Sequence, residues 1–120
     1  MTKTEALHSF FSSFGFDAYP SNALPVDVIY PYLTYTKGVG AGYEVSLHYH
    51  DYTESEKGPD DVIEGICATF RNGGVHVPYD GGVIWITIAH DNMEWYSLPD
   101  EGDRYHKHRI TDLTLDYEGE

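Results

Sequence analysis

Two histidines and one glutamate have the spacing in this chain that most specifically suggests chemistry. His48 and His50 lie two positions apart in a segment of alternating apolar and polar side chains, and Glu54 follows shortly after. Side chains two positions apart on a strand point to the same face, so both imidazoles are expected side by side. Imidazole nitrogens and carboxylate oxygens are common ligands of transition metals. The spacing permits a metal site, and the alternative is a pair of solvent-facing histidines.

This segment, with Gly42 ahead of it, resembles the first metal motif of cupins and implies a small cupin-like metal-binding enzyme using His48, His50 and Glu54. The chain departs from that motif at Asp61, where cupins have glycine. A helix is also expected there, where a cupin continues its barrel. We therefore keep the metal-binding enzyme as the alternative function and expect neither a metal nor a cofactor.

Other reactive side chains favour structural roles. His106 and His108 repeat the same spacing, but Lys107 and Arg109 alternate with them, which disfavours a metal and predicts a basic patch against the protein's own acids. Cys67 falls on the apolar face of a predicted helix, where a free thiol behaves as a small hydrophobe. The sequence contains no Gly-x-Ser-x-Gly motif. We expect no catalytic residues and a protein that is not an enzyme.

Length and charge exclude several classes of function. The chain has 120 residues, with 20 acidic and 7 Lys or Arg side chains and a formal net charge of −13. Such a surface repels nucleic acid phosphates and anionic membranes. The longest uncharged apolar run, residues 82–89, is far below the roughly 18 to 20 residues that span a bilayer. We expect one domain over residues 1–120, without specific nucleic acid binding and without membrane contact.

Apolar periodicity predicts the elements that position these residues. One helix is expected near the start, capped by Thr2 and Glu5 and ending at Gly15, and a second over residues 59–71. Residues 17–25 are expected to form a surface linker. Strands are expected over residues 28–36, 43–50, 75–79, 83–89, 93–98 and 104–117. The pattern predicts an α+β fold, with two amphipathic helices packed on one face of a mixed or mainly antiparallel sheet.

Aromatic residues are more numerous than one face of a small sheet can bury. The chain has 11 tyrosines and 2 tryptophans. Both residue types are enriched at protein interfaces, and the alternative is an aromatic-rich core with scattered exposed rings. We predict an interface formed by the aromatic residues Tyr30, Tyr32, Tyr35, Trp95 and Tyr96.

Three short motifs in sequence give the chain a family likeness: Phe-Gly-Phe at residues 14–16, Tyr-Pro at 19–20 and Pro-Tyr-Leu-Thr-Tyr at 31–35. With the order of elements around them, they resemble the tail terminator or tail completion proteins of long-tailed bacteriophages. These include proteins described as minor capsid or minor structural proteins. The resemblance spans nearly the whole chain and brings no catalytic residues.

The resemblance implies an α+β subunit that closes into a ring, commonly a hexamer, capping the tail tube. Its partners are other copies of the chain, the tail tube protein and head-tail connector proteins. It implies a location in the virion, at the tail or head-tail junction, and in the bacterial host cytoplasm during assembly. A third class, an adaptor domain of unknown partner, stays open.

The loops at residues 37–42 and 51–57 are expected to face the ring lumen or the tube. The acidic net charge is consistent with a lumen that does not bind the DNA passing through it. A head-to-tail ring also needs two different patches on each subunit. The candidate lumen or tube-facing residues are Lys37, Gly38, Gly40, Asp51, Glu54 and Glu56.

Overall fold

The first helix begins where the capping pattern predicts. The structure, a computed structural model, describes residues 1–37, 44–90 and 92–119. Helix α1 (Lys3–Ser12) starts after Thr2, whose hydroxyl accepts from the Glu5 backbone N–H while the Glu5 carboxylate accepts from the Thr2 N–H. The helix ends before Gly15, which has a φ of 93° in the turn that follows. Its buried face carries Leu7 and Phe11 into the core.

The second helix, α2 (Lys57–Phe70), matches the periodicity that predicted residues 59–71. Its apolar side chains recur at helical spacing, so they form one buried stripe. Cys67 belongs to that stripe and is fully buried, as expected. The stripe consists of Pro59, Ile63, Ile66, Cys67 and Phe70.

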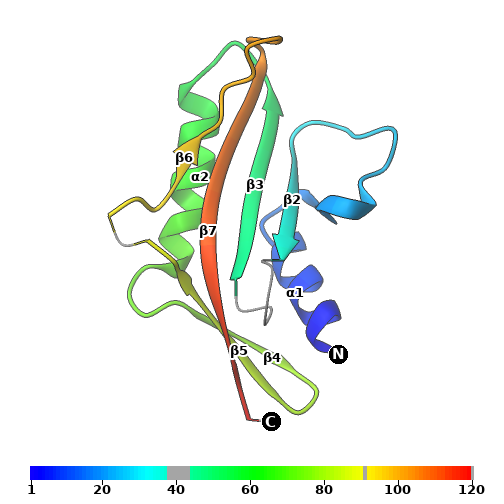
Figure 1. Ribbon diagram of the computed structural model, residues 1–120, viewed down its shortest axis with the longest axis vertical. Helices are drawn as coiled ribbons and strands as arrows, with labels where there is room; N and C mark the ends of the chain where they lie inside the picture. Colours follow the sequence, from blue (N-terminus) through cyan, green and yellow to red (C-terminus); the bar gives the residue numbers. More distant parts are fainter. Residues whose placement is uncertain (38–43, 91, 120) are drawn as a thin grey trace.

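The strands form one mixed, mostly antiparallel sheet, and the fold is α+β as predicted (Figure 1). The strands are β1 (Asp17–Pro20), β2 (Tyr32–Lys37), β3 (Glu44–Tyr52), β4 (Val75–Tyr79), β5 (Gly82–Ile88), β6 (Tyr96–Ser97) and β7 (His106–Glu118). Their order across the sheet is β1-β2-β3-β7-β5-β4, with β6 paired to β7. Among the strands of the described residues, only the β1–β2 pair is parallel.

Three predicted segments differ from the structure. The expected linker 17–25 contains β1 and a short 3-10 helix (Ser21–Ala23), because Ala18 packs into the core beside β2. The expected strand 28–36 begins only at Tyr32, after a cis Tyr30–Pro31 bond. Of residues 93–98, only β6 pairs with a neighbour.

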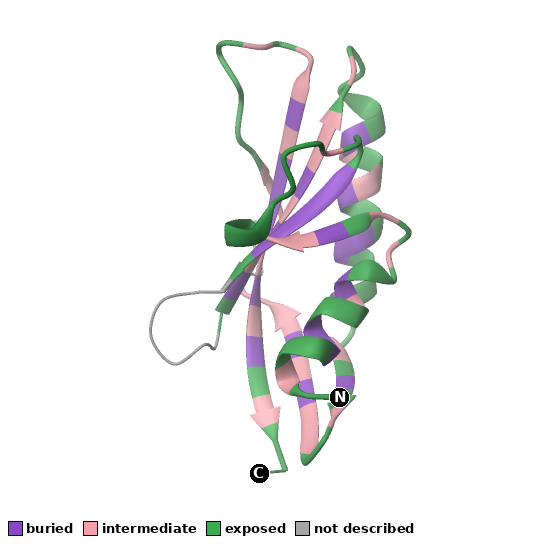
Figure 2. Ribbon diagram, turned by 90° about the vertical axis from the view of Figure 1, so that its right-hand side faces the viewer, coloured by how far each residue is buried: buried purple, intermediate pink, exposed green. Residues whose placement is uncertain are grey.

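Both helices lie on the same side of the sheet, which therefore has two unlike faces (Figure 2). Alternate residues of the central strands, such as Leu47 of β3 and Leu113 of β7, are fully buried in the core. The residues between them point to the opposite face, which neither α1 nor α2 covers. We call it the helix-free face. Among the described residues, no helix is long and apolar enough to cross a membrane.

Candidate functional site

Four histidines meet on the helix-free face, two from each of the neighbouring strands β3 and β7. His48 and His50 alternate with core residues on β3, and His106 and His108 do so on β7. The antiparallel register places His50 directly opposite His108. Side chains at opposed positions of an antiparallel pair lie close together on the same face. We call these four residues the histidine cluster.

The rings of the histidine cluster are in direct contact. The Nδ1 atom of His48 lies 2.6 Å from Nε2 of His108, and Nδ1 of His50 lies 3.3 Å from Nε2 of His106. The rings of His50 and His108 stack with centroids 4.3 Å apart. Three members, His48, His50 and His108, each bring one ring nitrogen to within 4.8 Å of the other two. This geometry matches a potential metal-binding group.

Neighbouring side chains hold two of these rings. The hydroxyl of Thr34 on β2 lies 3.0 Å from Nε2 of His50, and the ring of Tyr32 stacks on His50 at 4.7 Å between centroids. The Asp100 carboxylate accepts from Nδ1 of His106 at 3.1 Å. Hydrogen bonds of this kind fix ring orientation and tautomer.

Burial controls the charge of three of these imidazoles. It lowers the pKa of His50 to about 3, and repulsion from the neighbouring histidines adds to the effect. Burial also lowers the pKa of His108 to about 4, with further repulsion from nearby positive groups. The pKa of His48 is lowered by burial, against the opposing attraction of Asp112. These three rings are therefore neutral at neutral pH and have lone pairs available.

The cations next to these histidines in sequence lie on the other face of β7. Lys107 and Arg109 form ion pairs with acidic residues near the start of α2, as expected for a basic patch that contacts the protein's own acids. The nitrogen–oxygen distances are 2.9 Å from Lys107 to Glu56 and 2.7 Å from Arg109 to both Glu56 and Asp60. The histidines are not part of that patch, because strand alternation separates the two sets.

The alternative metal triad is not assembled in the predicted form. Glu54 lies in the loop after β3 and lines a surface hollow with Glu56 and Lys107, apart from the histidine cluster. The third member of the group is His108 instead of Glu54. Sequence spacing alone could not show that His108 lies next to β3.

The predicted aromatic interface divides into exposed and buried residues. Tyr30 is 39% exposed, whereas Tyr32 and Tyr35 are each 5% exposed and pack inside the subunit. Burial in the folded chain leaves Tyr32 and Tyr35 little surface to offer a partner, which corrects that part of the prediction. Trp95 and Tyr96 are half-buried, and the Trp95 indole donates to Glu64 at 2.6 Å.

The predicted lumen or tube-facing residues are also divided. Gly38 and Gly40 lie outside the described residues, and Lys37 is the last residue of β2. Asp51 belongs to β3 rather than to a loop and accepts from the Tyr49 hydroxyl at 3.0 Å. Glu54 is exposed in its loop. Glu56 directly precedes α2, and its carboxylate is engaged by Lys107 and Arg109, so it is not a free loop charge.

Two segments carry exposed apolar side chains that the sequence did not predict, because residues 17–25 were expected to be linker and residues 28–36 and 93–98 were expected to be strands. The first, residues 24–30, includes Val26 and Ile29, which are 100% and 78% exposed. The second, residues 93–98, includes Met93 and Leu98, which are 50% and 51% exposed. They project from opposite sides of the sheet, the first to the right of β2 and the second to the left of β7 in Figure 1.

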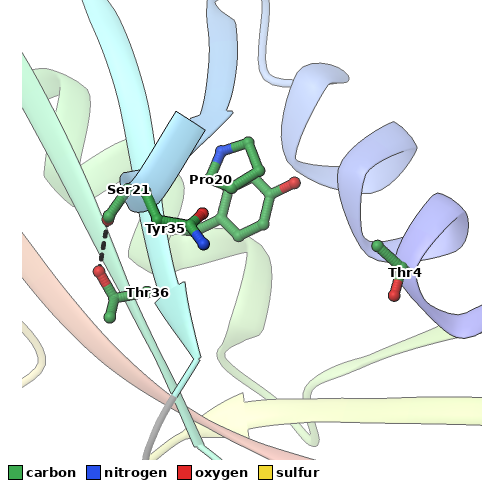
Figure 3. Close-up of a pocket in the computed structure, with 6 residues that line it drawn as sticks. Thr4, Pro20, Ser21, Tyr35 and Thr36 are labelled. Atoms are coloured by element: carbon green, nitrogen blue, oxygen red, sulfur yellow. Dashed lines mark hydrogen bonds between the residues drawn. The ribbon is translucent and has the colours of Figure 1, made fainter. Parts of the chain in front are cut away.

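A hollow of about 450 Å³ lies between α1 and the edge of the sheet at β1 and β2 (Figure 3). Its described lining includes no carboxylate, imidazole or amine and consists of Thr4, Pro20, Ser21, Asn22, Tyr35 and Thr36. The hydroxyls of Ser21 and Thr36 are hydrogen-bonded to each other. The described lining of the hollow thus presents hydroxyl, amide and apolar groups and no acid–base pair.

Comparisons with protein-family models, with curated proteins and with solved structures find no match to this chain. The function is therefore inferred from the residues of the chain, above all from the histidine cluster and the two apolar segments.

Proposed function

We propose that this protein is a non-enzymatic structural subunit of a bacteriophage tail or head-tail junction, similar to tail terminators, whose function is to assemble into a ring capping the tail tube. The observation that carries the proposal is the placement of two different exposed apolar segments on opposite sides of the subunit. The motifs at residues 14–16, 19–20 and 31–35 supply the link to phage tails.

A ring of identical subunits requires each subunit to offer two unlike, complementary patches. The first apolar segment and the second apolar segment meet this requirement, because they differ in sequence and lie on opposite sides of the sheet. Val26 is fully exposed and Ile29 is largely exposed. Covering these side chains with a neighbouring subunit removes apolar surface from water and therefore stabilises the association. Head-to-tail contact between the two segments buries both, and a hexamer is the ring size that the resemblance implies.

The net charge of −13 fits this role, since an acidic lumen repels the DNA that passes through it. The proposed partners are other copies of the chain, the tail tube protein and head-tail connector proteins. The proposed location is the virion, with the host cytoplasm as the place of assembly.

Two features disfavour the cupin-like alternative. Helix α2 occupies residues 57–70, where a cupin continues its barrel, and Glu54 lies apart from His48 and His50. The adaptor alternative is distinguished by stoichiometry, because an adaptor has no need to close a ring with copies of itself.

The test places a charge in the first apolar segment. Val26→Asp and Ile29→Asp should each weaken self-association by roughly tenfold or more, because a carboxylate replaces an apolar contact. Ser9→Asp, an exposed position on α1, is the matched control and should assemble like the wild type. Light scattering after size-exclusion chromatography measures the assembly, and circular dichroism verifies the fold. Unchanged assembly of both segment variants would overturn the proposal.

A further inference from the structure

We propose that His48, His50 and His108 form a binding site for one divalent transition-metal ion of the zinc class on the helix-free face. This site is independent of the proposed ring, which needs no metal. It differs from the cupin-like triad, because its third ligand comes from β7 and not from the loop after β3.

The donor set matches the chemistry of such an ion. Three imidazoles are a common protein ligand set for zinc, and the fourth position stays open to water. With metal–nitrogen bonds of about 2.0 to 2.1 Å, tetrahedral ligand atoms lie about 3.3 Å apart. The three ring nitrogens already lie within 4.8 Å of one another. The 2.6 Å separation between His48 and His108 must widen by less than about 1 Å, which side-chain rotation supplies.

The backbone holds the ligands in a fixed arrangement. His50 and His108 are directly paired across the β3–β7 ladder, and His48 is the next residue of β3 on the same face. Near the site both strands have an outer neighbour, because β2 pairs with β3 opposite His48 and His50 and β6 pairs with β7 at Arg109 and Ile110. Sites on strands are more precise than sites on loops, so little ordering is needed when the ion binds.

Groups around the ligands supply the hydrogen bonds that metal-bound histidines usually make to a second set of residues. The Thr34 hydroxyl contacts Nε2 of His50 at 3.0 Å. Beside the site, Asp100 fixes the ring of His106, whose Nε2 lies 3.3 Å from Nδ1 of His50. Such outer partners orient metal ligands and raise affinity. The buried ring of Tyr32 stacks on His50 and limits water access from the β2 side.

The same contacts also permit a metal-free cluster, in which neutral imidazoles donate and accept hydrogen bonds in pairs. This alternative predicts no saturable metal binding, so an experiment separates it from the proposal. The long-range field favours cation capture, because the chain carries a net charge of −13.

The experiment is a titration of the chelator-treated, dialysed wild-type protein with Co²⁺, followed by visible absorption. We expect intense bands typical of tetrahedral coordination, saturation at one ion per chain, and loss of the bands on addition of Zn²⁺. His48→Gln and His108→Gln should each weaken binding about tenfold to a hundredfold. The matched control is His76→Gln, because His76 lies on β4 against Trp85 and away from the cluster.

Absence of tetrahedral bands in the wild type would overturn the proposal, and so would cluster variants that bind like the wild type. Circular dichroism verifies that each variant is folded. A second measurement needs no variant: the wild type should melt at a higher temperature in excess Zn²⁺ than in chelator. No such increase would also overturn the proposal. The chelated protein should still assemble, so failure of the metal site and failure of the ring are distinguishable.

Discussion

Arg109 is a buried cation that joins the sheet to the start of α2. Its side chain is 4% exposed, and it donates to Glu56 and Asp60, each at 2.7 Å. Lys107 adds a second contact to Glu56. A buried guanidinium that loses its carboxylates keeps its desolvation cost without compensation. The stability of the helix–sheet junction therefore depends on the ionised form of Glu56.

This dependence predicts a pH effect. Hydrogen bonds from Lys107 and Arg109 hold the pKa of Glu56 below its ordinary value of 4.5. Below pH 4.5 the unfolded chain therefore binds more protons at this position than the folded chain does, and the stabilisation is lost as pH falls. Glu56→Gln should lower the urea midpoint at pH 7, and the difference from wild type should shrink at acidic pH. Glu54→Gln, an exposed carboxylate in the same loop, is the control and should change neither midpoint.

The buried state of Tyr32 changes the expected outcome of its substitution. A role at the interface alone predicts weaker assembly without loss of stability. Because the ring is 5% exposed and contacts His50 and Tyr30, Tyr32→Ala should instead lower the free energy of unfolding by roughly 3 kcal/mol. Tyr30→Ala, at an exposed neighbouring position, should cost much less. Chemical denaturation measures the free energy of unfolding of both variants. Equally small losses of stability in the two variants would contradict the structural role of Tyr32.

At the scale of the elements, the turn from α2 into β4 depends on glycine. Gly74 has a φ of 81°, and a Cβ there would lie 2.4 Å from the Ile86 carbonyl oxygen. Gly65, inside α2, has open space where a Cβ would be. Substitution by alanine is therefore expected to lower the stability of the protein at Gly74 and to raise it at Gly65.

Gly74→Ala should destabilise the protein by roughly 1 to 3 kcal/mol, because it adds both backbone strain and a clash. Gly65→Ala should stabilise it by about 0.5 to 1 kcal/mol, because alanine is the better helix former. Thermal unfolding of the two variants measures both effects. A stabilised Gly74→Ala variant would show that the close approach of β5 to this turn is wrong.

Local patterns were sufficient for most elements. The spacing of Ile63, Ile66 and Phe70 predicted α2, and the capping-box spacing of Thr2 and Glu5 predicted the start of α1. Alternation on β3 correctly placed His48 and His50 on one face. These features depend on residues a few positions apart, which is the range over which periodicity carries information.

Long-range pairing could not be predicted in the same way. His50 and His108 meet because β3 pairs with β7, and nothing in the spacing of either strand specifies that partner or its register. Strand β1 was expected to be linker, because four residues with one buried alanine carry too weak a pattern. The burial of Tyr32 and Tyr35 likewise follows from packing of the loop and of α1 against β2, and not from their residue types.

At the scale of the whole molecule, the subunit has two unlike sides and two unlike faces. The two α-helices lie on one face of the sheet and the histidine cluster lies on the other. The two apolar segments lie on opposite sides of the sheet. This asymmetry favours head-to-tail association over two-fold pairing, because two-fold pairing uses the same patch twice. The ring proposal follows from this arrangement together with the phage-like motifs.

The most direct test of the ring is native mass spectrometry of the purified protein over a concentration series, in the presence of a chelator. The account predicts one closed homo-oligomer, with a hexamer as the expected size, that forms without metal and is weakened by Ile29→Asp. A monomer or a two-fold dimer at every concentration would contradict it, because neither joins the first apolar segment of one copy to the second apolar segment of the next.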